Sequence, residues 1–334
     1  MSTTKERHHY IDIARGLLII MVVYYHTMLP VDIPIVTRIW NRFGFISFFM
    51  AGFFIITGLV TNFHRDSWLQ FLWKKFKGII IPTITFLFIQ HWLPSLFDST
   101  DIPQFFGLPF EFFYGKMPWF ISALFFSLII NYALIRYIKK KPYILLSSFI
   151  LYLLGIISHT QGWILDRNEV IYCVNHILTM NIFLTIGYML RDVRLRWWYI
   201  LIFIPLFEAV ILSTNFLPYG IPFIAGGTLY VDYVSMIPFL IMALCGSLTL
   251  LILCQFLKEN SVLEYVGRHT LGIYILQGGL ISPLLHLLLL RQSGISEYSQ
   301  VIIFFLIVIL VTLISAIISQ LLNSKHLKWS MGKF

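Results

Sequence analysis

Charged residues are scarce in this chain of 334 residues. Only 12% of them are Asp, Glu, Lys or Arg, whereas a soluble globular domain carries roughly a quarter. A soluble domain could not cover its surface with so few charges. The composition, which is 58% hydrophobic, excludes a cytosolic enzyme, a disordered chain and a secreted disulfide scaffold, and it indicates a protein that faces lipid.

Cysteine, cleavage signals and metal motifs are also lacking. The three cysteines (Cys173, Cys245 and Cys254) lie inside apolar runs, so neither a disulfide framework nor a CxxC-type zinc site is readable. The first apolar run contains Asp12 and Arg15 and has no small-residue cleavage site, so we expect no cleavable signal peptide. No histidine spacing matches a metal motif such as HExxH, and we predict no metal.

Long apolar runs are abundant instead. A transmembrane helix needs about 20 mostly apolar residues, and strands of an outer-membrane barrel would alternate over about ten. The candidate spans are 11–29, 41–62, 79–97, 117–135, 143–158, 171–190, 197–214, 233–256, 270–290 and 299–322. We therefore predict an all-α polytopic membrane protein with about ten transmembrane helices. Residues 8–322 would form a single membrane domain, and 323–334 a short basic tail.

The net charge of +9 is explained by where the basic residues lie. Lys and Arg concentrate in cytoplasmic loops of membrane proteins. With the N-terminus inside and ten spans, most Lys and Arg fall in inner segments, whereas Asp and Glu lean to the outer ones. We predict a multi-pass protein of the bacterial cytoplasmic membrane with both termini in the cytoplasm, and we expect no nucleic-acid partner.

Two ionisable residues lie on the first span. Arg15 and His26 are eleven residues apart, which is three turns plus about 20°, so they share one helix face about 16 Å apart. An ionisable group at membrane depth is costly, and each is therefore a functional candidate. The alternative is that Arg15 reaches the headgroups and His26 makes a hydrogen bond between helices.

Four further segments follow this R-x(10)-H pair in a fixed order. They are FFMAGF at 48–53, FLWKKFKGIIIP at 71–82, PWF at 118–120 and GRHTLGIYILQ at 267–277. The ordered set resembles the integral-membrane acyltransferase family 3, although Ala51 stands where that family usually has Ser and Gln277 where it has His. The resemblance implies an acyltransferase, and O-acetylases of sugars and surface glycans belong to that family.

The resemblance implies a donor and two functional residues. The donor would be acyl-coenzyme A as co-substrate, with acetyl the commonest acyl group. His26 is then the candidate general base, because His is the usual choice near neutral pH, and Arg15 the residue that holds donor phosphates. Lys74 and Lys75 are further donor-binding candidates, although the preference of basic residues for inner loops explains them equally well.

Two more residues complete the predicted site. Glu208 is the other deep charge, and we expect its carboxylate to orient the His26 imidazole; the alternative is a protonated Glu bonded to a neighbouring helix. Trp119 is a candidate for binding the acceptor on the resemblance, although an aromatic belt would also place it there. The expected partners are a glycan or sugar acceptor, the lipid bilayer and a polysaccharide-synthesis machinery.

Two other functions fit the composition. A secondary transporter of a small polar metabolite would also have about ten spans and scattered polar groups, but transporters often show inverted repeats, and we find none here. A non-catalytic subunit of a polysaccharide exporter is the second alternative.

Overall fold

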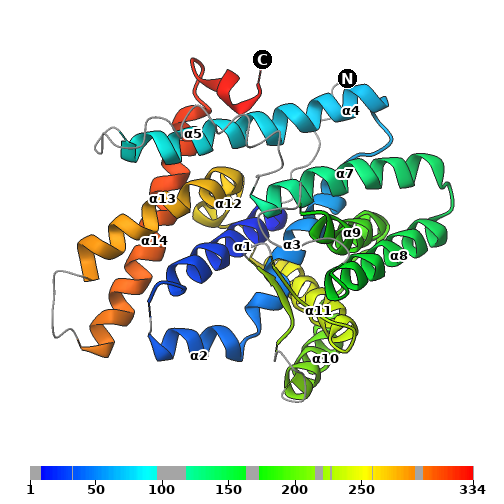
Figure 1. The fold of residues 1–334 in the computed structure, drawn as a ribbon, viewed down its shortest axis with the longest axis horizontal. Coiled ribbons are helices and arrows are strands. Elements are labelled where there is room, and N and C mark those ends of the chain that lie inside the picture. Colours follow the sequence, from blue (N-terminus) through cyan, green and yellow to red (C-terminus); the bar gives the residue numbers. More distant parts are fainter. Residues whose placement is uncertain are drawn as a thin grey trace.

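The computed structural model describes residues 9–31, 33–95, 118–162, 173–214, 221–225, 228–257, 259–289 and 296–333. Its centre is α1 (His9–Met28), drawn in blue in Figure 1. This helix packs against α3, α11, α12, α13 and α14. Leu18, Ile19 and Val22 of α1 are buried in the core. The helix that carries Arg15 and His26 therefore runs through the interior of the bundle.

The remaining elements surround α1 (Figure 1). The helices are α2 (Pro34–Arg42), α3 (Phe45–Val60), α4 (Trp68–Lys75), α5 (Ile81–Ser95), α7 (Trp119–Tyr137), α8 (Lys141–Thr160), α9 (Val174–Met189), α10 (Ile200–Ser213), α11 (Met236–Phe256), α12 (Ser261–Arg268), α13 (Thr270–Leu289) and α14 (Glu297–Leu322). A π-helical turn, η1 (Phe76–Ile80), joins α4 to α5, and 3-10 turns lie at η3 (Leu190–Asp192), η4 (Trp197–Tyr199) and η6 (Lys328–Met331). Two short strands, β1 (Phe223–Ala225) and β2 (Thr228–Tyr230), pair antiparallel with Phe223 opposite Tyr230.

Each of the ten apolar segments contains a helix, which confirms the all-α class. Among the described residues, five helices (α1, α7, α8, α11 and α14) are long and apolar enough to cross a membrane. The pair α2 and α3, bent by 56°, would add a sixth span if it crosses as one unit. The count of about ten spans stays a prediction.

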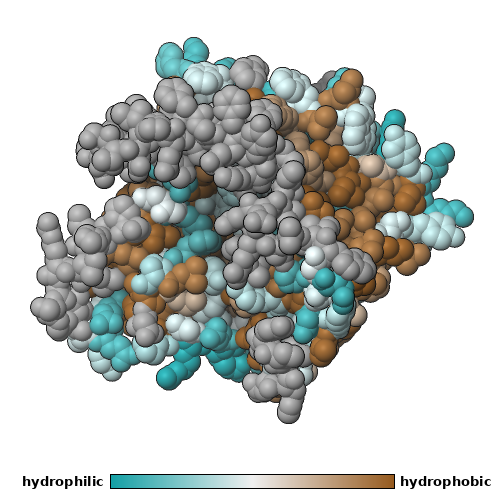
Figure 2. All heavy atoms as spheres, in the orientation of Figure 1, coloured by the Kyte–Doolittle hydropathy of each residue, from teal (hydrophilic) through white to brown (hydrophobic). Residues whose placement is uncertain are grey.

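The outer surface has the composition of a lipid-facing wall. Figure 2 shows a broad apolar area over α7 and α8. On α8 the exposed residues include Leu145, Leu146, Ile150 and Leu154. Soluble proteins rarely expose contiguous apolar patches of such extent, so the surface and the helix lengths together indicate a multi-pass membrane protein.

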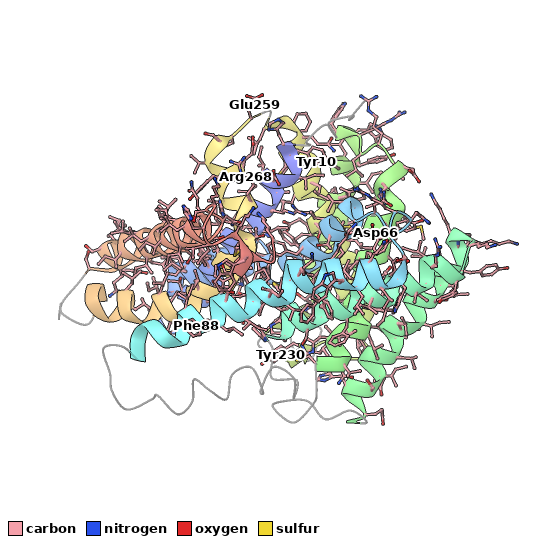
Figure 3. All side chains as sticks on the ribbon, turned by 90° about the horizontal axis from the view of Figure 1, so that it is seen from above. Tyr10, Asp66, Phe88, Tyr230, Glu259 and Arg268 are labelled. Carbon is pink, nitrogen blue, oxygen red and sulfur yellow. The ribbon has the colours of Figure 1, made fainter. Side chains whose placement is uncertain are left out.

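Two segments expected inside and one segment expected outside lie toward opposite ends of the molecule (Figure 3). In Figure 3, Tyr10, Glu259 and Arg268 lie toward one end, and Tyr230 toward the other. The first three belong to segments expected inside and Tyr230 to a segment expected outside. Which end faces the cytoplasm stays a prediction.

The C-terminal segment is docked on the bundle, whereas we expected only a short basic tail. The turn η6 packs against α5, where the Thr85 hydroxyl donates a hydrogen bond of 2.8 Å to the Ser330 carbonyl. Gly332 has φ +67° and lies so close to the Lys77 carbonyl oxygen that an added Cβ would be 1.9 Å from it. A glycine is therefore needed here both for the backbone conformation and for the space.

Candidate active site

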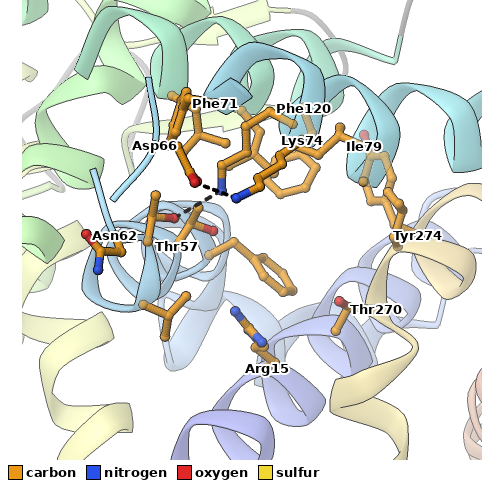
Figure 4. A pocket seen from close by; sticks show the side chains of 18 of the residues that line it. Arg15, Thr57, Asn62, Asp66, Phe71, Lys74, Ile79, Phe120, Thr270 and Tyr274 are labelled. Atoms are coloured by element: carbon orange, nitrogen blue, oxygen red, sulfur yellow. Dashed lines mark hydrogen bonds and ion pairs between the residues drawn. The ribbon is translucent and has the colours of Figure 1, made fainter. Parts of the chain in front are cut away.

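A cavity of about 720 Å³ opens between α1, α3, α4, α7 and α13 (Figure 4). Its volume is in the range of small-molecule sites. The residues that line it are Arg15, Ile19, Phe53, Thr57, Val60, Thr61, Asn62, Arg65, Asp66, Phe71, Lys74, Lys75, Gly78, Ile79, Phe120, Leu124, Leu128, Thr270, Leu271 and Tyr274. The structure thus brings Arg15, Lys74 and Lys75 together at one cavity.

Positive charge dominates one part of this cavity. Arg15, Arg65, Lys74 and Lys75 line it, against the single carboxylate of Asp66. Lys74 Nζ donates to Asp66 Oδ1 at 2.5 Å, as Figure 4 shows. A concave site lined by one sign of charge concentrates ligands of the opposite sign. The cavity is therefore suited to an anionic ligand.

Each donor-binding candidate is held by a neighbour. Arg15 Nη1 lies 3.7 Å from Asp12 Oδ1, one turn earlier on α1. Lys75 Nζ donates to Thr61 Oγ1 at 3.4 Å. The pKa of Lys75 is lowered to about 8, because burial and the charge of Arg15 both lower it and together outweigh the opposing charge of Asp66. Lys75 lies before the expected span at 79–97. With this pKa its side chain is mostly charged at pH 7, and it loses its charge as the pH rises through about 8.

Other parts of the cavity wall are apolar and aromatic. The Phe120 ring lies 5.6 Å from that of Phe53 and 5.0 Å from that of Tyr274, measured between ring centroids. Ile19, one turn after Arg15, is the last residue of α1 along the wall. A ligand with a charged head and an apolar arm would match this division.

Two glycines set the position of Arg15. A Cβ added to Gly267 on α12 would lie 1.8 Å from the Asp12 carbonyl oxygen, and one added to Gly16 would lie 2.3 Å from the Leu263 carbonyl oxygen. The backbones of α1 and α12 are therefore in direct contact, as small residues allow in membrane bundles. This contact holds the backbone of α1 in place beside Arg15.

His26 lies beyond the cavity on the same helix. It is half-buried, and its Nδ1 lies 2.8 Å from the Val22 carbonyl oxygen. Because a carbonyl only accepts, Nδ1 carries the proton and Nε2 keeps a lone pair. Seven residues, or about 10 Å of helix, separate Ile19 from His26. The imidazole therefore has the tautomer of a general base, but it does not line the cavity.

Comparison with known proteins decides the family. A model described as an acyltransferase domain matches residues 8–320 of the chain. The chain belongs to acyltransferase family 3. It is therefore an acyltransferase, which disfavours the transporter and the exporter subunit. No curated protein and no solved structure matches the chain.

The motifs that resemble the family converge on the cavity. Every one of the five segments supplies at least one lining residue: Arg15, Phe53, Lys74 with Lys75, Phe120 and Tyr274. These segments are spread over most of the chain. Their convergence makes this cavity the best candidate for the active site of an acyltransferase family 3 protein.

Glu208 does not take the place that we expected. Its Oε2 accepts a hydrogen bond of 2.9 Å from Arg42 Nη1, and both side chains are partly exposed. The reason is that α10 packs mainly against α11 rather than against α1. The expected pair of Glu208 with His26 is therefore corrected: the Val22 carbonyl holds the imidazole proton.

Trp119 lies next to the cavity and not in it. It begins α7, and its ring centroid is 5.0 Å from that of His176. The neighbouring Phe120 reaches the cavity wall instead. Both belong to the PWF segment, so the motif is at the site although the expected residue points elsewhere.

Sequence analysis missed several lining residues. Arg65 and Asp66 lie in a short polar stretch between two apolar runs. Charged residues are expected in such a connection, so they did not indicate a site. Phe53 and Tyr274 stand inside two of the five segments, but one aromatic residue in an apolar helix looks like any other core residue. Membership of those segments was the one signal that could have identified them.

Proposed function

We propose that this chain is a membrane O-acyltransferase that moves an acyl group, acetyl foremost, from acyl-coenzyme A to a hydroxyl of a cell-surface glycan or related sugar. The proposed location is the bacterial cytoplasmic membrane. The observation that carries the proposal is the convergence of all five motif segments on one basic cavity. A polyanionic donor with a long thin arm would match the charged and aromatic residues that line this cavity.

The donor would bind with its phosphates at Arg15, Lys74 and Lys75. Arg supplies paired, charge-assisted hydrogen bonds, and Lys supplies point charges. The pantetheine arm would then pass Ile19 and the aromatic residues and extend toward His26, over the last ~10 Å of helix. With the N-terminus inside, the donor enters from the cytoplasm and the acyl group emerges at the outer side.

His26 would act as the general base. Its Nε2 takes the proton of the acceptor hydroxyl while the hydroxyl oxygen forms a bond to the thioester carbonyl carbon. The carbon–sulfur bond then breaks, and the coenzyme A thiolate leaves and receives the proton. The Val22 carbonyl, bonded to Nδ1–H, favours the imidazolium formed between these steps. Trp119, near the same end of the cavity as Phe120, is proposed to contact the acceptor.

The test is acyl transfer by purified protein in detergent. We expect acetyl-coenzyme A to be cleaved only when a glycan acceptor is present. His26→Ala should lower kcat by about 10² to 10⁴, the usual contribution of a general base. The matched control is His64→Ala, because His64 is exposed and bonded to Tyr188. The same protein reconstituted in vesicles provides the opposing result: vectorial uptake of a solute without thioester cleavage would overturn the proposal.

Arg15 should produce a different kind of defect. If it holds donor phosphates, Arg15→Ala raises KM for acyl-coenzyme A more than it lowers kcat. Arg15→Lys should recover only part of the affinity, because a point charge replaces a planar set of donors. Lys141→Ala is the control, since Lys141 pairs with Asp192 at the surface. Unchanged coenzyme A binding in Arg15→Ala would make Arg15 a structural residue.

A further inference from the structure

A buried amide faces the candidate base from a second helix. Gln277 on α13 is 3% exposed, and its Nε2 lies 3.4 Å from His26 Nδ1. Its Oε1 is buried and has no hydrogen-bond partner among the described residues. The amide atom that faces away from His26 has no partner among the described residues whichever way the group is turned, so the contact with His26 decides its orientation.

The Val22 carbonyl requires the proton on Nδ1, so an amide N–H pointing at the same nitrogen would meet another N–H. Oxygen and nitrogen of a Gln side chain are assigned from their hydrogen bonds and are otherwise nearly indistinguishable. Turning the Gln277 amide by half a rotation places Oε1 beside Nδ1–H. The imidazole proton is then shared between two oxygen acceptors, Val22 on its own helix and Gln277 on α13.

We propose that Gln277 is a positioning residue that holds His26 in the tautomer of a base and stabilises the imidazolium during transfer. The inference rests on the proposed function. It gives to Gln277 the task that the sequence had suggested for Glu208, whose carboxylate is bonded to Arg42. A neutral amide oxygen does this without placing a charge beside the base.

The packing of α13 supports this arrangement. A Cβ added to Gly278 would lie 2.9 Å from Gln90 Nε2, so the glycine allows α5 to approach α13. Helix α13 therefore packs between α5 and α1, with the residue before that glycine directed at α1. The contacts of α13 with α5 on one side and α1 on the other hold it in place, and from there the Gln277 side chain faces His26.

The surroundings of His26 are otherwise poor in titratable groups. Tyr25 is a titratable side chain that lies beside the imidazole, with ring centroids 5.5 Å apart. The helices packed against α1 carry the following titratable residues: none on α3, Cys245 and Cys254 on α11, Glu264, Tyr265 and Arg268 on α12, Tyr274 and His286 on α13, and Glu297 and Tyr298 on α14. The side chain of His286 lies outside the described residues. Glu264 is bonded to His9, at the other end of α1.

The experiment compares Gln277→Leu with Gln277→Glu in acyl transfer. Gln277→Leu removes the acceptor, and we expect kcat to fall roughly tenfold, the effect of one hydrogen bond, with KM for acetyl-coenzyme A unchanged. Gln277→Glu keeps an acceptor and should recover most of the rate. Its carboxylate favours the imidazolium, so the acid limb of the pH–rate profile should move to higher pH. A merely structural role would move no limb of the profile.

A second readout is independent of turnover. In protein labelled with ¹⁵N histidine, the parent should show His26 protonated at Nδ1, and Gln277→Leu should shift the Nδ1–H resonance, because one of its two acceptors is lost while the Val22 carbonyl remains. Coenzyme A binding by each variant checks that the protein is folded. Parental kcat in Gln277→Leu, an unmoved acid limb in Gln277→Glu, or an unchanged Nδ1–H resonance in Gln277→Leu would each overturn the inference. A parent that holds the Nδ1–H tautomer but transfers no acyl group would contradict the proposed function alone.

Discussion

The lowered pKa of Lys75 predicts how donor binding depends on pH. A phosphate binds the charged ammonium better than the neutral amine, so this contribution is present below about pH 8 and is lost as the pH rises through it. At pH 9 about one molecule in eleven keeps the charge, against ten in eleven at pH 7. If the protein with a neutral Lys75 does not bind the donor, the Kd should rise about tenfold between pH 7 and pH 9, and a smaller rise measures the affinity that Arg15 and Lys74 supply without it.

The assay is calorimetric titration with an S-alkyl thioether of coenzyme A, which has no titrating thiol. Phosphate is nearly fully ionised above pH 7 and adds little to the slope. Lys75→Arg should keep its affinity at pH 9, because a guanidinium does not lose its proton in this range. Lys141→Arg, at the exposed surface pair with Asp192, is the matched control and should behave as the parent. A parent whose Kd is constant from pH 7 to pH 9, or a Lys75→Arg variant with the same slope as the parent, would refute this reasoning.

Three further substitutions test the frame of the site. Gly267→Ala places a methyl group against the backbone of α1, so we expect a loss of about 1–3 kcal/mol in stability and weaker coenzyme A binding. The Tm in detergent and the Kd measure both, and a parental Tm would show that the helices are not in contact. Glu208→Gln weakens a partly exposed ion pair, so stability should change by about 1 kcal/mol or less and kcat within about twofold. A hundredfold fall in kcat would instead indicate that Glu208 takes part in catalysis. Gly332→Ala should release the docked turn η6 and raise KM for the donor with kcat unchanged, whereas an unchanged KM would mean that the turn does not support the cavity.

The helices and most of the basic residues of the cavity could be predicted from the sequence. Apolar runs locate helices because lipid requires every backbone group to be paired within the segment. The single-helix spacing of Arg15 and His26 is likewise a property of the chain itself. Arg15, Lys74 and Lys75 were predicted as candidates for donor binding, and the structure places all three at one cavity.

What was wrong or missed depends on which helices become neighbours. Glu208 and His26 were expected at a similar depth in the membrane. Depth does not predict which helices are neighbours, and α10 packs against α11. The short helices α4 and α12 lie in connections between the expected spans, and these connections are too polar to be predicted as spans. Gln277 was set aside because it replaces a histidine, and only the packing of α13 on α1 shows what its amide faces. Helix order in space is not contained in a hydropathy pattern.

The docked turn η6 has a practical consequence for handling this protein. It rests on α5, to which it is joined by the bond from Thr85 to the Ser330 carbonyl, and Gly332 lies against Lys77 of η1, the turn that leads back to Lys74 and Lys75 on α4. An affinity tag or a fluorophore attached just after Lys333 is thus one short turn away from the wall of the cavity. A tag there would pull on the donor site, whereas a fluorophore there would sense whether the site is filled.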